Sequence, residues 1–323
     1  MNILLQQLSE LLRKEGADLV RVGGVDRMTN RDVIQRLMPN CRSVLCIAFR
    51  QLRGSRRGIE EGTTYYQYTT TAVETLEEII MPMTLQRGCS FLEKNGFLAL
   101  PQRRNQLVMS EWDSTNPEVD YTEIYRGKAV ENQLDFEQTA IDCGLGERGL
   151  SGSILTDDFG PCQRWVFLLT DAELPESPLV VPHLCDKCGA CLKACPGHAI
   201  AIDGTLNRWQ CAAYYNGASG KKNPFLPPDA FLNDPERLAV LAGEANLTPE
   251  RAREILDQIH FYPNIKHAYY ASICGKNCDT ACYIHLEEKG KLIRSFKTPF
   301  RKRPEWALPL EGPGTENLQQ EMS

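Results

Sequence analysis

The sequence predicts an α+β protein in two parts, and three observations support this. Up to about residue 180, amphipathic helical stretches alternate with short apolar runs typical of strands. A proline-rich segment, "DAELPESPLVVP" at 171–182, then interrupts the pattern. Beyond it, eight of the thirteen cysteines fall between residues 185 and 282. We therefore expect a mixed α/β domain at 1–180, a cysteine-rich domain at 181–292 and an extended tail at 293–323.

The N-terminal part begins with a predicted amphipathic helix. Its five leucines share one helical face: Leu4, Leu5, Leu8, Leu11 and Leu12. A long helix is expected at 72–95, kinked at Pro82 and stopped at Gly96. The other elements expected are strands at 43–50, 97–101, 105–110 and 164–171, and helices at 131–146, 230–243 and 248–260.

Composition excludes several classes of protein. With 42% hydrophobic and 24% charged residues, the chain has a globular profile. Its net charge of −6 argues against a general nucleic-acid binder. No run approaches the roughly 20 apolar residues of a membrane span, and the N-terminus lacks the cationic start of a signal peptide. We expect a cytoplasmic protein without membrane contact.

The cysteines need a chemical explanation, because disulfides are disfavoured in a reducing compartment. Five of them are scattered and are expected to be small buried hydrophobes: Cys41, Cys46, Cys89, Cys143 and Cys162. The others are clustered. The stretch "LCDKCGACLKACPGHAI" at 184–200 has the spacing C-x2-C-x2-C-x3-C-P of bacterial ferredoxins. In two-cluster ferredoxins the fourth cysteine of this run ligates the other [4Fe–4S] cluster.

A count of thiols then predicts two clusters. Besides the four in the motif, four more follow at Cys211 and in "CGKNCDTAC" at 274–282. The first cluster is expected to use Cys185, Cys188, Cys191 and Cys282. The second is expected to use Cys195, Cys211, Cys274 and Cys278. A zinc site is disfavoured, because three cysteines at C-x2-C-x2-C are awkward ligands for one tetrahedral ion.

The loop "GLGERG" at 144–149 matches G-x-G-x-x-G literally, yet it does not predict a dinucleotide site. That fingerprint needs a strand before it and a helix after it, whereas here a helix precedes and a strand-like run follows. One interpretation is a tight helix-to-strand turn with glycines at positive φ. The other is a backbone surface against a flat cofactor, formed by Gly144, Gly146 and Gly149.

With these features together, the chain resembles the epoxyqueuosine reductase family, cobalamin- and iron–sulfur-dependent reductases related to reductive dehalogenases. The resemblance covers residues 35–290 and rests on "RSVLCIAF", "CGLGERGLSGSIL", the ferredoxin motif, Cys211 in "RWQCAAYY" and the late cysteine trio. It implies a nitroreductase-like α/β domain followed by a ferredoxin-like domain with two [4Fe–4S] clusters. It also implies base-off cobalamin between them, reduced by one cluster.

The chain departs from the family pattern at several positions. Glu147 and Leu150 stand where the family's glycine loop has an aromatic residue and a lysine. The place of the catalytic aspartate falls at Val130, next to Glu131, which becomes the candidate proton donor. The late trio is C-x3-C-x3-C rather than C-x2-C-x3-C, and the C-terminal extension of many tRNA-acting members is missing. We therefore expect a small-molecule substrate rather than tRNA.

A tyrosine-rich stretch, "RGIEEGTTYYQYTT" at 57–70, offers a second candidate acid, Tyr66. The alternative is a helix start with half-buried tyrosines. Arginines at 50, 53, 56 and 57 could hold an anionic group or form a solvated face.

Three functions remain open. The first is a corrinoid-dependent reductase of a small substrate, supplied with electrons by a low-potential ferredoxin or flavodoxin. The second is an electron-transfer protein that reduces a partner's corrinoid or other cofactor. The third is a reductase with FMN in place of the corrin.

Overall fold

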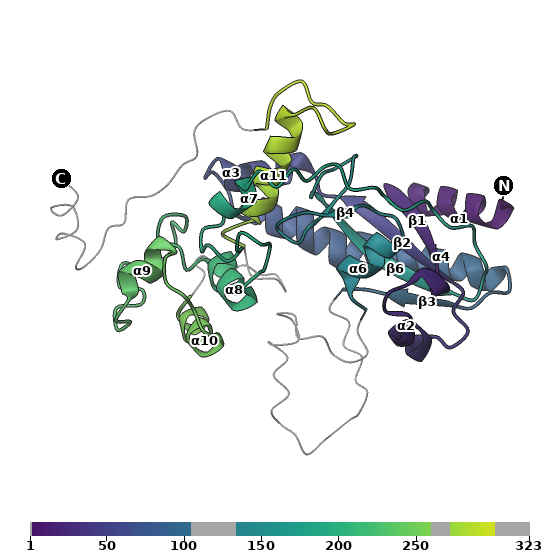
Figure 1. The fold of residues 1–323 in the computed structure, drawn as a ribbon, viewed down its shortest axis with the longest axis horizontal. Coiled ribbons are helices and arrows are strands. Elements are labelled where there is room, and N and C mark those ends of the chain that lie inside the picture. Colours follow the sequence, from purple (N-terminus) through teal and green to yellow (C-terminus); the bar gives the residue numbers. More distant parts are fainter. Residues whose placement is uncertain (1, 105–133, 260–271, 301–323) are drawn as a thin grey trace, which may run out of the picture.

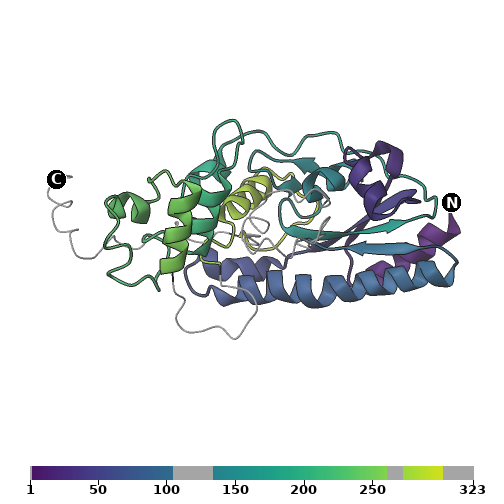
Figure 2. The ribbon, with the colours of Figure 1, turned by 90° about the horizontal axis from the view of Figure 1, so that it is seen from below.

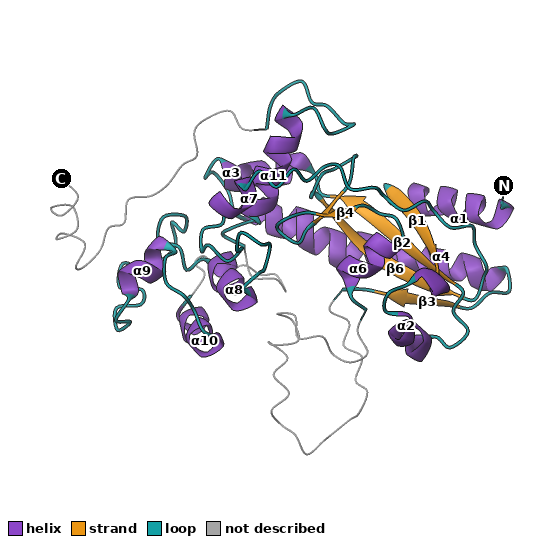
Figure 3. Cartoon of the chain, in the orientation of Figure 1, coloured by secondary structure: helices purple, strands orange, loops and turns teal. Residues whose placement is uncertain are grey.

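The computed structural model describes residues 2–104, 134–259 and 272–300, and it is a mixed helix–sheet structure as predicted (Figure 1). The strands and their covering helices lie at one end of the molecule. The short helices of the cysteine-rich part lie at the other end (Figure 3). Among the described residues, no helix has the length and apolar composition needed to cross a membrane.

A four-stranded sheet forms the centre of the N-terminal part. Its order is β1 (Leu19–Gly24), β2 (Ser43–Arg50), β6 (Gln163–Thr170) and β3 (Ala99–Gln102), and every neighbouring pair is antiparallel. The predicted strands at 43–50 and 164–171 are confirmed to within one residue. Both are buried along almost their whole length, because helices cover both faces of the sheet.

Alternate residues of β2 supply two separate cores. Leu45 and Ile47 pack with α1 (Ile3–Lys14) and α4 (Met81–Lys94) on one face. Val44 and Cys46 pack with α2 (Arg31–Leu37) and α6 (Phe136–Asp142) on the other. The leucine face predicted for the first helix is confirmed where Leu8 and Leu12 are completely buried.

A long helical segment runs along the α1 face of the sheet (Figure 2). It begins earlier than predicted, with the π-helix η2 (Tyr68–Ile80), and continues as α4 to Lys94. Pro82 lies in the first turn of α4, where the π-helical hydrogen-bond pattern ends; proline has no N–H to continue it. Gly96, at φ +84°, ends the segment as expected.

Other predicted boundaries shift. The helix expected at 131–146 is described only as α6, which starts after Asp135 because the Asp135 carboxylate caps the Gln138 N–H at 2.8 Å. The expected helices at 230–243 and 248–260 shorten to α9 (Arg237–Ala242) and α10 (Pro249–Gln258). The strand at 97–101 is β3, and the strand predicted at 105–110 lies outside the described residues.

The remaining elements lie around the cysteines and next to the sheet. They are η1 (Val25–Arg27), α3 (Arg53–Glu60), the hairpin strands β4 (Glu147–Arg148) and β5 (Ile154–Leu155), α7 (Ala190–Lys193), α8 (Arg208–Asn216) and α11 (Asn277–Glu288). Among them, α7 and α11 pack together. This brings the late cysteines to the ferredoxin-like motif.

The core on the α1 face predicts a stability effect. Leu12→Ala should lower the free energy of unfolding by about 3 kcal/mol, because it removes a fully buried side chain and leaves a cavity. Chemical denaturation followed by circular dichroism measures this. Ile3→Ala, on the same helix but 71% exposed, is the control and should change stability by about 0.5 kcal/mol or less. Equal effects of the two substitutions would contradict this packing.

Candidate metal and cofactor site

The ferredoxin-like motif folds as a tight loop followed by one helical turn. Lys187 and Gly189 both have left-handed backbone conformations, at φ 57° and 75°. Gly189 caps α7, which carries Cys191, and a Cβ at this glycine would meet no atom within 4 Å. The conformation therefore favours glycine by its backbone angle rather than by crowding.

The first group of thiols contains Cys185, Cys188, Cys191 and Cys282. Burial, followed by the nearby Cys188 and Cys185 thiols, raises the pKa of Cys191. Burial also raises the pKa of Cys282, with further contributions from Asp279, Cys191 and Cys185. Cys188 is the exposed member of this group. The structure thus brings α11 to the first three cysteines of the motif.

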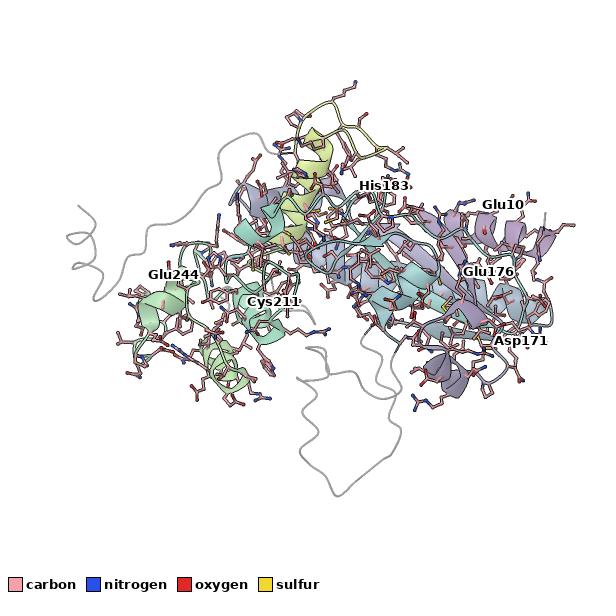
Figure 4. The ribbon with its side chains drawn as sticks, in the orientation of Figure 1. Glu10, Asp171, Glu176, His183, Cys211 and Glu244 are labelled. Atoms are coloured by element: carbon pink, nitrogen blue, oxygen red, sulfur yellow. The ribbon has the colours of Figure 1, made fainter. Side chains whose placement is uncertain are left out.

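The second group contains Cys195, Cys211, Cys274 and Cys278. Burial, with a smaller contribution from Cys195, raises the pKa of Cys211 to about 11. Burial likewise raises the pKa of Cys274 to about 12, and Cys211 and Cys195 add to it. The apolar cluster around Cys195 includes Cys211 and Cys278, and it also includes Cys191 of the first group, so the two groups are neighbours. Figure 4 shows Cys211 on α8, in the cysteine-rich part.

Each group offers four thiols, which matches the ligand set of a [4Fe–4S] cluster. Cys278 and Cys282 lie one turn apart on α11, so this helix contributes one thiol to each group. Backbone N–H groups approach several sulfurs: Leu150 N to Cys185 Sγ at 3.4 Å, and Ala199 N to Cys195 Sγ at 3.3 Å. Such donors stabilise thiolates and tune cluster potentials. The residues present therefore fit the predicted clusters.

A cavity of about 1050 Å³ lies between the sheet and the cysteine-rich part. Its walls come from the start of α6, the β4–β5 hairpin, the start of β6, α8 and the approach to α11. Cys185 and Cys211 both line it, so a thiol from each group reaches the same space. This volume lies at the upper end of the range for small-molecule and cofactor sites.

The glycine loop divides into two parts with different roles. Gly144, at φ +76°, ends α6, and its N–H and that of Leu145 bond back to Ile141 and Ala140 carbonyls. A Cβ at Gly146 would lie 2.1 Å from the Leu155 carbonyl oxygen. Of the three glycines proposed for cofactor binding, the described cavity wall includes Gly149 and not Gly144 or Gly146. The helix-to-strand interpretation therefore applies to Gly144.

The wall that replaces the expected glycine surface is the hairpin loop at 149–153. Gly149 N donates to the Ser153 carbonyl at 2.8 Å, and every residue from Glu147 to Ile154 lines the cavity. Gly152, at φ +83°, has no atom within 4 Å of its Cβ position. Gly152 therefore lies outside the literal G-x-G-x-x-G match at 144–149, on which the cofactor-binding prediction was based.

Glu147 is almost completely buried, at 3% exposure, although it lines the cavity. Its carboxylate accepts N–H groups from His183, Leu184 and Cys185 at 2.5, 3.0 and 2.7 Å. Burial would raise the pKa of Glu147, but these three donors hold it below the usual value. Figure 4 places His183 on the segment that leads into the cysteine motif.

A buried charged group forms another part of the wall. Asp279, at 1% exposure, accepts the Ser153 hydroxyl at 2.6 Å. Its carboxylate lies 3.5 Å from Lys276 Nζ and 3.8 Å from a guanidinium nitrogen of Arg56. Burial opposes ionisation, but the two cations lower the pKa of Asp279. Sequence reasoning missed this group, although two charged residues between predicted ligands in "CGKNCDTAC" were a usable signal.

The two candidate acids receive no support from their positions. Glu131 lies outside the described residues. Tyr66 starts the helical segment that becomes η2, and it is not among the described residues that line the cavity. Its hydroxyl is buried without a described hydrogen-bond partner. The arginines nearby include Arg53, which pairs with Glu287 at 2.6 Å, and Arg56, which is 2% exposed.

The five scattered cysteines are buried, as predicted. Cys41, Cys46 and Cys143 pack in the core on the α6 face of the sheet, and Cys89 packs in the core on the α1 face. Burial raises the pKa of Cys41 and of Cys89 to about 11. These thiols are therefore protonated at neutral pH and serve as small apolar side chains.

The site and its sequence pattern define the class: residues 178–201 match the family model described as "4Fe-4S binding domain". Beyond this class, the chain is 42% identical over 65 residues to the tetrachloroethene reductive dehalogenases of Desulfitobacterium hafniense and Dehalobacter restrictus. The match spans 19% of this chain and only 12% of those relatives.

Solved structures similar to this one are epoxyqueuosine reductases and reductive dehalogenases. The epoxyqueuosine reductase of Streptococcus thermophilus has a TM-score of 0.46 at 13% identity, covering 90% of this chain and 83% of that one. The catabolic reductive dehalogenase NpRdhA has a TM-score of 0.48 at 12% identity, covering 77% and 35%. The curated relatives are reductive dehalogenases, one of the groups to which the sequence resemblance pointed.

The two parts of the glycine loop predict different responses to substitution. Gly146→Ala should destabilise the protein by about 3 kcal/mol, because its Cβ would collide with the Leu155 backbone. Gly152→Ala should cost about 1 kcal/mol, since it adds only backbone strain in an open space. Chemical denaturation of both variants measures the difference. The opposite ranking would contradict the packing described for this hairpin.

Proposed function

We propose that the protein is an iron–sulfur oxidoreductase with two [4Fe–4S] clusters, and that the cavity between its two parts holds a corrinoid and a small substrate. The observation that supports this best is the position of Cys185 and Cys211, one thiol from each group, in the wall of one large cavity. Clusters ligated there would lie next to whatever the cavity binds, as electron transfer requires.

In this proposal the ligands are Cys185, Cys188, Cys191 and Cys282 for one cluster. The other cluster uses Cys195, Cys211, Cys274 and Cys278. The surroundings of four thiols support the assignment: among cysteines, those with the largest effects on the pKa of Cys191, Cys282, Cys211 and Cys274 belong to the same group as the affected thiol. The loop that ends at Gly189 and helix α11 carry ligands of the clusters. The sheet forms the opposite wall of the cavity.

The cavity suits a large planar cofactor on its hairpin side. Gly149 and Gly152 line it with backbone alone, so a flat macrocycle could lie close to the chain there. A bound corrinoid would supply a strongly reducing metal centre. The residues of this chain would orient the ligands and exclude water: Arg164 and Lys276 supply positive charge, and Trp165 and Leu206 supply apolar surface. The nitroreductase-like character of the N-terminal domain belongs to the same proposal.

A reduction also needs electrons and a proton. Cys188 is exposed, which supports electron entry through the first cluster. Exposed lysines nearby, Lys187 and Lys193, would suit an acidic ferredoxin or flavodoxin. Glu131 remains the candidate proton donor, with Tyr66 as the second candidate. A small-molecule substrate, a cytoplasmic location and the domain limits at 180 and 292 remain proposals as well.

An electron-transfer protein and an FMN-dependent reductase are the alternatives, and one experiment separates them. Anaerobically purified protein should bind added cobalamin in a 1:1 ratio, because the cavity is large enough and reached by both thiol groups. After unbound cobalamin is removed, absorption spectra recorded with the clusters bleached should show corrin bands. Flavin bands instead would favour the FMN-dependent reductase, and neither band would favour the electron-transfer protein.

Separate ligand sets predict the iron content of a cysteine variant. Wild-type protein should contain about eight irons, and Cys188→Ala should retain about half of them, because Cys188 belongs to one cluster only. Iron and labile sulfide analysis measures this. Cys41→Ala, which changes a buried thiol in the sheet core, is the control and should keep the full content. Fewer than about three irons in wild-type protein would refute the two-cluster proposal.

A further inference from the structure

A buried carboxylate links the cavity wall to the first predicted cluster ligand. Glu147 lies on β4, in the N-terminal part, whereas all three of its backbone donors lie at 183–185, where the cysteine motif begins. Both carboxylate oxygens are used: Oε2 accepts from His183 and Leu184, and Oε1 accepts from Cys185. The contact therefore fixes the backbone of Cys185 relative to the β4–β5 hairpin.

The same hairpin reaches Cys185 a second time. β4 pairs with β5 in the register Glu147 to Leu155, and the loop between them carries Leu150. The Leu150 N–H donates to Cys185 Sγ at 3.4 Å. Two residues of one hairpin thus bind Cys185: the Glu147 carboxylate accepts the backbone N–H of Cys185, and the Leu150 N–H donates to its sulfur. Because the loop of this hairpin also lines the cavity, the hairpin connects the cavity wall directly to a proposed cluster ligand.

The negative charge of Glu147 has no close cationic partner among the described residues. The nearest described cationic candidate for the Glu147 carboxylate is His183 Nδ1, at 3.8 Å, and this imidazole is half exposed. Three backbone N–H groups donate to this buried carboxylate and so favour its ionised form, and burial leaves its negative charge poorly screened. An electron added to a cluster beside it would be repelled, so the cluster would be harder to reduce.

We propose that Glu147 is a positioning residue that fixes Cys185 and keeps the reduction potential of the first cluster low. This inference rests on the proposed function, because it assumes a cluster on Cys185, Cys188, Cys191 and Cys282. It goes beyond the family resemblance, in which an aromatic residue occupies the place of Glu147. The low potential would favour onward electron transfer toward the cavity, since a poorly oxidising cluster gives up its electron readily.

Two variants separate charge from shape. Glu147→Gln keeps the length of the side chain and removes the charge, whereas Glu147→Asp keeps the charge and shortens the reach. A redox titration of protein without added cobalamin, monitored by electron paramagnetic resonance, measures the midpoint potential of each cluster. E147Q should retain the full iron content and shift one midpoint potential upward, leaving the other unchanged. E147D should keep that midpoint close to the wild-type value.

A third variant controls for a general effect on the cavity. Glu137 lines the same cavity and pairs with Arg104 at 2.9 Å, without a described contact to the cysteine motif. E137Q should leave both midpoints unchanged. Unchanged midpoints in E147Q, or an equal upward shift in E147D, would overturn the role of the charge. If E147Q loses iron, E147D decides: a wild-type midpoint supports the inference, and a shifted one overturns it.

The outcomes also distinguish this inference from the proposed function. Wild-type protein without iron–sulfur clusters would refute the proposed function itself. Wild-type protein with two clusters whose potentials do not respond to E147Q would refute only the role of Glu147.

Discussion

The convergence of eight cysteines, seven of them buried or partly buried, at the junction of two structural parts is the constraint on which the rest of the structure depends. Burial raises the pKa of Cys211 to about 11 and that of Cys274 to about 12, so without metal these groups remain protonated. Iron would replace the protons and share the thiolate charge. Folding of this region is therefore coupled to cluster assembly in our proposal, and α11 has the central place because it serves both groups.

The four-stranded sheet contributes part of the cavity wall and none of the proposed cysteine ligands. Its strands β2 and β6 are buried on both faces, and side chains at the start of β6 open into the cavity. The hairpin β4–β5 extends this wall to the cysteine motif through Glu147 and Leu150. Packing and hydrogen bonding together thus fix where a cavity ligand would lie relative to the thiols.

Much of this arrangement could be predicted from local pattern. The strands at 43–50 and 164–171 were recognisable because continuous apolar runs of that length fit buried strands. The scattered cysteines were recognisable as core residues because they lack ligand spacing. The start of η2 was not predictable, since no local signal distinguishes π-helical from α-helical hydrogen bonding. A local cap decided where α6 begins, because the Asp135 carboxylate accepts the N–H of Gln138, three residues later.

The sequence by itself determined the chemistry: the number and spacing of the thiols, and with them the 4Fe-4S class. Ligand spacing within a short loop is a local property, so it can be read directly. Only the tertiary structure decided that Glu147 approaches Cys185, that Asp279 meets Ser153 and Arg56, and that Gly149 rather than Gly144 faces the cavity. These contacts join residues that lie tens to hundreds of positions apart in the sequence. Because they depend on tertiary packing, no local pattern of polar and apolar residues predicts them.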